Sequence, residues 1–329
     1  MTNSYAPKVK KLRSNGVAPV ANPEIKISVA AEQWRFIAYL SFWGMVAYAI
    51  VLSKTLVTPY LAAGPSDGST CGPFNRDSPA FGVSPGKGFD FSTQSHLQEL
   101  FGFANICANW DYSPSRELTA MVYPLFEYSL VVYLCLDFMA TAIAHKRGDL
   151  EEWFWNFSKV TFPVCVFLCS QFRMIFVCIA YENVQHHTAG FLGLQIVLIL
   201  VAVQNTLFIW DSNTVYAQLG GITNTRRAAL AYLIANLIVS SIKIKATIFV
   251  VMNGFGAPWT LEPSILPGKC VGQLVDLIWM IFNALLPLLI ARFRSKNERP
   301  LEITISQKGV YECDTEGENA SLINYGTAK

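Results

Sequence analysis

The chain has 329 residues, of which 52% are hydrophobic and only 15% are charged, and its formal net charge at pH 7 is +2. Soluble domains average about 25% charged residues, so the composition argues against a soluble protein. The small net charge also argues against nucleic acid as a partner. Long apolar runs lie between short charged segments, and a run of about 18 apolar residues can cross the hydrocarbon core. The sequence therefore predicts an all-α, polytopic integral membrane protein.

The hydrophobic pattern divides the chain into three parts. Residues 1–33 form a polar, basic tail that lacks the apolar core of a secretory signal, and we expect it to be unstructured. Residues 34–293 form a bundle of six transmembrane helices, and residues 294–329 form a flexible polar tail. In that tail only 301–305 alternates like a strand, and it is too short to carry a prediction. The predicted spans are 36–57, 118–144, 160–180, 188–210, 228–253 and 271–291.

Lys and Arg predict the orientation of the bundle. They concentrate in the two tails and in the segments 145–152 and 211–227, and are sparse in the opposite loops. Cytoplasmic segments carry the excess of Lys and Arg, so we expect both termini to be cytoplasmic. The protein is then integral to the plasma membrane or an endomembrane, with the lipid bilayer as its first partner.

The loop between the first two spans, 58–117, is predicted to be an ordered extracytoplasmic loop. It is rich in Gly, Pro, Ser and Asp, and it contains Cys71 and Cys107. Disulfides form on the oxidising side of a membrane, so a Cys71–Cys107 bridge is the first expectation. Either cysteine could pair with Cys270 instead, because three outward thiols leave one over.

Ionisable residues inside the spans give the main functional clue. A rise of 1.5 Å per residue places five of them about 8 to 15 Å from the outer ends of four spans. Charges at such depth are costly and usually face a bundle interior or a water-filled cavity. Gln195 lies at the same level, and Asp137, Gln204 and Asn205 form a second set nearer the inner side. The five charged residues are Glu127, Arg173, Lys243, Lys245 and Asp276.

Two interpretations of these charges remain open. They can line a polar cavity, which indicates a channel or transporter, and their excess of one positive charge favours a small ion or an anionic solute. They can instead pair and hold helices together, with Arg173 and Glu127 as the expected bridge. Lys243 and Lys245 are two residues apart, so they point to nearly opposite faces of a helix and cannot both line a narrow pore.

Other function classes have weaker support in the sequence. A non-transporting scaffold, accessory or receptor subunit would bind a protein partner or a second copy through its outer loop and inner tail. A membrane-embedded enzyme is less favoured, because no predicted span contains His and no hydrolase, metalloprotease or phosphate-binding motif occurs. Glu182, His186 and His187 share one outer turn, but a metal site needs three or four ligands with supporting contacts, so we predict no metal and no cofactor.

Overall fold

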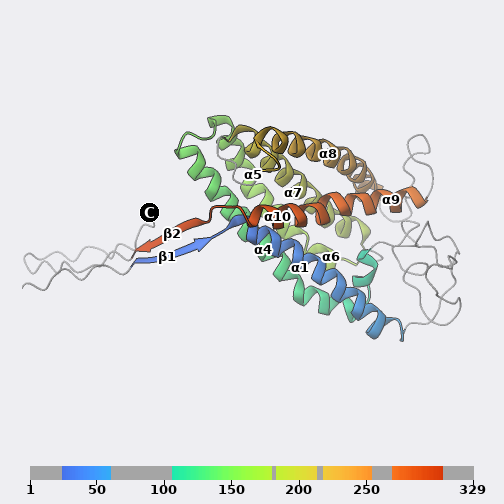
Figure 1. Cartoon of the computed structure of the whole chain (residues 1–329). Coiled ribbons are helices and arrows are strands. Elements are labelled where there is room, and N and C mark those ends of the chain that lie inside the picture. Colours follow the sequence, from blue (N-terminus) through green and yellow to red (C-terminus); the bar gives the residue numbers. More distant parts are fainter. Residues whose placement is uncertain (1–23, 61–105, 180–182, 213–217, 254–268, 307–329) are drawn as a thin grey trace, which may run out of the picture. The chain divides into compact units, whose positions relative to one another are not determined.

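The computed structural model describes residues 24–60, 106–179, 183–212, 218–253 and 269–306, and these are mostly helical (Figure 1). Within these residues, six helices are long and apolar enough to cross a membrane, which confirms the predicted count. Most of the described chain belongs to one compact unit, Ala30–Leu301. The six candidate spans are Ala31–Val57, Ser115–Lys146, Glu152–Val177, Val184–Asp211, Ile222–Ile248 and Leu274–Ser295.

The spans are built from regular helices joined by a few irregular turns. We call the end of the bundle where α1 begins and α10 finishes the terminal end, and the other the opposite end. Helix α1 packs against α4 and α10, and α7 packs against α5 and α8. The elements of the bundle, in chain order, are α1 (Ala31–Leu52), η1 (Ser53–Val57), η4 (Ile106–Trp110), α4 (Ser115–Lys146), α5 (Glu152–Gln171), α6 (Met174–Val177), α7 (Val184–Asp211), α8 (Ile222–Asn253), α9 (Lys269–Met280), η5 (Ile281–Leu285) and α10 (Leu286–Ser295).

Small residues let α5 and α7 approach closely. A Cβ on Gly190 would lie 2.8 Å from the carbonyl oxygen of Gln171, and one on Gly193 would lie 3.2 Å from that of Leu168. Glycine is common at helix contacts in membranes, because burial of apolar surface contributes little to helix association there and close packing must supply the attraction. The outward helix surfaces carry exposed large apolar side chains, as expected for contact with lipid, and examples are Met121, Leu125, Phe167 and Ile238.

Span 6 is interrupted by a π turn. The segment η5 separates α9 from α10, and Pro287 is the second residue of α10. A π turn and a proline both release backbone carbonyls from the helical ladder. The carbonyl of Phe282 accepts a hydrogen bond from the Tyr232 hydroxyl at 2.9 Å, and that of Ala284 accepts one from Trp43 Nε1 at 3.4 Å. The irregular segment is therefore held to α8 on one side and to α1 on the other.

Span 3 begins earlier than predicted and also ends in a break. Its helix starts at Glu152, so Trp153 and Trp155 lie inside the helix rather than before it. An acidic residue in the first turn suits the positive end of the helix dipole, which favours a helix that begins at Glu152, while residues 147–151 remain a turn. Helix α5 ends at Gln171, and the short α6 follows after Phe172 and Arg173.

The ends of the chain contain two strands that the sequence analysis did not predict. β1 (Glu24–Val29) pairs with β2 (Leu301–Ser306) in a two-stranded sheet, and the two strands run in opposite directions (Figure 1). The expected unstructured tail was therefore wrong for residues 24–29. Pairing between segments so far apart in sequence cannot be read from either alone. Of the loop predicted over 58–117, residues 61–105 lie outside the described part of the chain.

Candidate functional site

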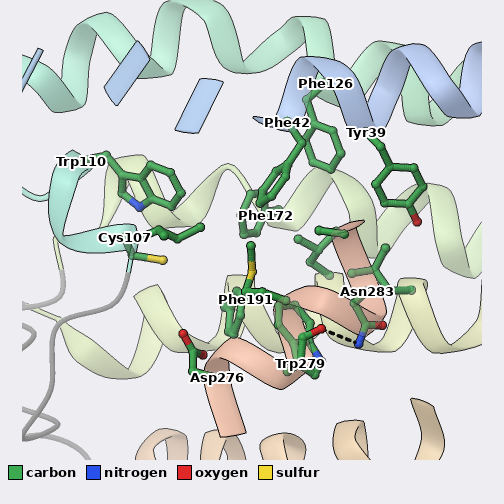
Figure 2. Close-up of a pocket in the computed structure, with 15 residues that line it drawn as sticks. Tyr39, Phe42, Cys107, Trp110, Phe126, Phe172, Phe191, Asp276, Trp279 and Asn283 are labelled. Atoms are coloured by element: carbon green, nitrogen blue, oxygen red, sulfur yellow. Dashed lines mark hydrogen bonds between the residues drawn. The ribbon is translucent and has the colours of Figure 1, made fainter. Parts of the chain in front are cut away.

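A small cavity lies inside the bundle, between α1, α4, α7 and span 6 (Figure 2). Its volume is about 30 Å³, which is room for about two water molecules. Seven of its fifteen lining residues are aromatic, and span 6 adds the polar residues Asp276 and Asn283. We call this cavity the chamber. The aromatic side chains that bound it include Phe42, Trp110, Phe126, Phe172, Phe191 and Trp279.

The 3-10 turn η4 brings Trp110 into the chamber wall. The hydroxyls of Ser53 and Ser115 both donate to the carbonyl oxygen of Asn109, at 2.7 and 2.6 Å. These two bonds tie η4 to η1, which follows α1, and to the first residue of α4. Trp110 is buried, and its ring centroid lies 6.0 Å from that of Phe176. A segment that follows a long loop is thus fixed against the bundle by side chains of the first two spans.

An ion pair borders the chamber. Lys243 of α8 donates from Nζ to the carboxylate of Asp276 in α9, and both side chains are largely buried, at 3% and 13% exposed. Lys243 Nζ also lies 5.5 Å from the ring centroid of Phe191, close enough for a cation–π attraction. A buried charge is tolerated when an opposite charge faces it. The structure therefore brings together two of the predicted site residues at one edge of the chamber.

Three buried polar atoms on chamber residues have no hydrogen-bond partner among the described residues. They are Nε1 of Trp110, Nε1 of Trp279 and Oδ1 of Asn283. Buried polar groups are nearly always paired, and leaving one unpaired costs about 1–3 kcal/mol. The chamber wall thus contains two donors and one acceptor whose hydrogen-bonding capacity the described chain does not use.

A ladder of polar side chains leads from the chamber toward the terminal end. Asn283 donates to Ser240 Oγ at 3.4 Å, Ser240 donates to Asn236 at 2.7 Å, and Asn236 donates to the Tyr232 hydroxyl at 3.3 Å. Asn236, Ser240 and Asn283 are all buried. The sequence analysis missed this ladder because it followed charges and amides near the middle of single spans, whereas these residues come together only when α8 packs against span 6.

A charged cluster, which we call the terminal network, lies where α1 begins and α10 ends. The carboxylate of Glu32 accepts from Arg294 at 2.6 Å and from Arg35 at 3.5 Å. Oδ1 of Asn205 accepts from the same two guanidinium groups, at 2.8 and 3.4 Å. Asn205 also donates to the Tyr133 hydroxyl at 2.9 Å, so span 4 and span 2 join the cluster.

Glu298 completes the terminal network. Its carboxylate accepts from the backbone amides of Ala31 and Glu32, at 3.2 and 2.8 Å, and so caps α1, whose own N-cap residue Ala30 makes no side-chain cap. Burial, with a contribution from the charge of Glu32, raises the pKa of Glu298 to about 7, against the lowering effects of these backbone bonds and of Arg294. The sequence analysis treated residue 298 as part of a flexible tail and therefore missed it.

Two of the three residues in the inner set, Asp137 and Gln204, contact each other. Gln204 donates to the carboxylate of Asp137 at 2.8 Å, and its amide oxygen accepts from Thr161 at 3.3 Å. Asn205, the next residue, belongs to the terminal network. Nearer the opposite end, Gln195 donates to Thr247 at 3.1 Å, which links spans 4 and 5. The amide side chains of span 4 therefore bond to residues of other helices.

The remaining predicted charges lie elsewhere. Glu127 accepts from Arg173 at 2.7 Å, which confirms the predicted bridge, but the Arg173 side chain is half exposed. Lys245 is exposed, whereas Lys243 is buried, so the two lysines lie on different faces of α8, as predicted. The structure therefore does not bring Arg173 or Lys245 to the chamber, and of the five outer-level charges only Lys243 and Asp276 meet there.

The predicted turn motif and the predicted disulfide lie partly beyond the described residues. Glu182 and Cys71 are not among them. His187 is buried with Nδ1 2.8 Å from the carbonyl oxygen of Cys178, and His186 contacts the Asn183 side chain at 2.8 Å. Among the residues that the structure describes, no group of three or more His, Cys, Asp or Glu side chains is placed to hold a metal ion.

Comparisons with protein-family models, with curated proteins and with solved structures found no match to this chain. The site must therefore be interpreted from its own chemistry. What the geometry establishes is a helical bundle suited to a membrane, with a small aromatic chamber, an ion pair at its edge and polar side chains extending from it toward one end.

Proposed function

We propose that this protein is a channel or transporter that moves a small ion or polar solute through the centre of its bundle. The observation that most supports this is the succession of buried polar groups at three levels: the Lys243–Asp276 pair, the ladder from Asn283 to Tyr232, and the terminal network. On span 6 alone, Asp276 and Arg294 are separated by about 27 Å of helix at 1.5 Å per residue. That distance covers most of a hydrocarbon core of about 30 Å.

Cohesion between helices does not by itself account for the chamber. Polar bonds between membrane helices contribute to stability only when they are made. Trp110, Trp279 and Asn283 instead keep unpaired polar atoms on residues that line a cavity, beside a buried ion pair. Intramembrane ionisable residues that face a cavity commonly mark the path of an ion or solute. Together, the unpaired atoms and the ion pair favour passage of a solute through the chamber over a purely structural role for these residues.

The experiment is flux into vesicles that contain the purified full-length protein, with labelled chloride, methanesulfonate, glycine and tetramethylammonium as probes. Lys243→Met leaves Asp276 facing the chamber without its cation, and we expect it to change the rate of at least one probe about tenfold or more. Lys245→Met makes the same substitution two residues away on an exposed face and should leave every rate unchanged.

Wild-type protein that admits none of these probes faster than empty vesicles would overturn the proposal. It would favour the alternative, a membrane scaffold, accessory or receptor subunit. Equal rates for wild type, Lys243→Met and Lys245→Met would show that any flux avoids the chamber. In both cases, capture of a protein partner by the full chain becomes the next measurement.

We also propose that the terminal end faces the cytoplasm and that Cys71 and Cys107 form a disulfide in an ordered outer loop. Basic residues at the terminal end, among them Lys146, Arg147 and Arg226, support the orientation. Access of an impermeant label to a tag at each terminus tests the first statement. The mass of the Cys71–Cys107 peptide pair before and after reduction tests the second.

A further inference from the structure

We infer that the chamber selects a small zwitterion, a solute with one positive and one negative group and no net charge. This inference rests on the proposed function, because it assigns the solute class to the same path. The first argument is charge balance at the chamber. Of the three lysine and arginine residues at that level, Lys245 is exposed, Arg173 pairs with Glu127, and Lys243 pairs with Asp276, so the pair at the chamber edge has no net charge of its own.

A balanced ion pair disfavours a solute with net charge. A lone anion or cation that enters a low-dielectric cavity beside a neutral pair leaves one charge uncompensated, and that cost is severe. A zwitterion avoids this cost, because its ammonium group can face the Asp276 carboxylate while its carboxylate faces Lys243. Lys243 and Asp276 then each keep an opposite charge as a neighbour.

The unpaired polar atoms fit the same class of solute. The indole N–H groups of Trp110 and Trp279 can donate to a carboxylate, and Oδ1 of Asn283 can accept from an ammonium group. All three side chains are at least 97% buried, so a solute in the chamber could bond them, whereas bulk solvent does not reach them. The aromatic wall adds to this, because an ammonium group is attracted to ring faces, as Lys243 already is to Phe191.

The size of the chamber limits the solute and indicates how it would be admitted. At about 30 Å³ the chamber has room for about two water molecules, so even the smallest amino acid requires its wall to move. Asn283 and Ala284 of the wall belong to the π turn η5, next to Pro287. π turns recur at functional sites because their backbone bonds are easily rearranged. Movement of η5 away from α7 would enlarge the chamber at its polar edge.

Three probes with equal numbers of non-hydrogen atoms test the inference: glycine, methanesulfonate and tetramethylammonium. Their influx is measured in vesicles at zero voltage, and binding of labelled glycine to the detergent-purified full chain is measured by equilibrium dialysis. Wild type should admit glycine at least about tenfold faster than either ion. Asp276→Asn should reverse the preference toward methanesulfonate, and Lys243→Met toward tetramethylammonium. Lys245→Met should keep the wild-type order.

Each outcome decides between the two statements. Flux without preference for glycine overturns the zwitterion inference and keeps the proposed function. Saturable glycine binding that Asp276→Asn abolishes, without flux, keeps the inference and overturns the proposed function. If the protein shows no glycine binding and no flux, both the inference and the proposed function are overturned, and water is left as the occupant of the chamber. If Asp276→Asn fails to fold, Trp279→Phe, which removes one indole donor, should lower glycine binding at least about threefold, and unchanged binding would overturn the inference.

Discussion

The chamber and the terminal network both bury charge in the bundle, but they use it differently. In the terminal network most groups have two partners: Glu32 and Asn205 each accept from both Arg294 and Arg35, and Glu298 accepts from two backbone amides. Only Nε of Arg35 makes no bond there within the described residues, and it does not line the chamber. At the chamber an ion pair stands beside indole and amide atoms that make no bond within the described chain. A network whose members bond one another clamps helices, whereas unused bonding capacity on a cavity wall marks a site.

The largest effect in this comparison should come from Asp276→Asn. The substitution leaves the buried Lys243 ammonium without its carboxylate, and breaking one side of a buried pair costs about 3–5 kcal/mol. We expect the free energy of unfolding, measured by denaturant titration in detergent, to fall by about that amount. The double variant Lys243→Met with Asp276→Asn should recover most of the loss, since no charge is then left unpaired. A fully stable single variant would contradict the description of the pair as buried.

Arg294→Gln should have a smaller effect because the terminal network is redundant. Glu32 keeps Arg35 and Asn205 keeps Tyr133 after the substitution. A charge-assisted hydrogen bond is worth about 1.5–3 kcal/mol, and because both acceptors keep other donors the loss should be nearer the value of one bond than of two. We therefore expect a loss of about 2 kcal/mol in unfolding free energy and no change in which solutes enter vesicles. A change in solute preference would show that the terminal network also takes part in choosing which solutes enter.

Glu298 makes the terminal network sensitive to pH. The pKa of Glu298 is raised from 4.5 to about 7 in the folded protein, so between these values the folded state binds a proton that the unfolded state does not. Its contribution to stability is then largest at acidic pH and falls as pH rises toward about 7. Glu298→Gln should flatten that part of the curve of unfolding midpoint against pH. The same slope in the variant and in wild type would assign the effect to another group.

The smallest effect should come from Lys245→Met. Its side chain is exposed on the face of α8 away from Lys243, and surface substitutions usually change stability by less than about 0.5 kcal/mol. We expect unchanged unfolding and unchanged flux. A loss of flux comparable with that of Lys243→Met would place Lys245 in the path and contradict the arrangement of α8.

Much of the fold could be predicted because hydrophobic length and helical periodicity act locally. These gave the six spans, the opposite faces of Lys243 and Lys245, and the bridge between Glu127 and Arg173. Asp276 was predicted as a site residue because it is an ionisable residue inside a span. The similar depth of Asp137 and Gln204 was predicted, and the structure shows that the two side chains bond to each other.

The remaining features depend on which helices touch. Glu32 and Arg35 precede the predicted start of span 1 at residue 36, but α1 begins at Ala31 because Glu298, nearly the whole chain away, caps it. The strand over 24–29 needs a partner at 301–306. The π turn in span 6 has no sequence signature in its own five residues, although Pro287 follows two residues later, and it is held by Tyr232 and Trp43 from other spans.

The central claim is that water and a small solute reach the chamber, and access to Asn283 tests it most directly. In a chain whose native cysteines are replaced, Asn283→Cys is treated in sealed vesicles with a water-soluble, membrane-impermeant thiol reagent. The account predicts modification from at least one side, slowed by glycine, while Ile238→Cys on the exposed apolar face of α8 stays unmodified. A folded Asn283→Cys protein that the reagent reaches from neither side would contradict it.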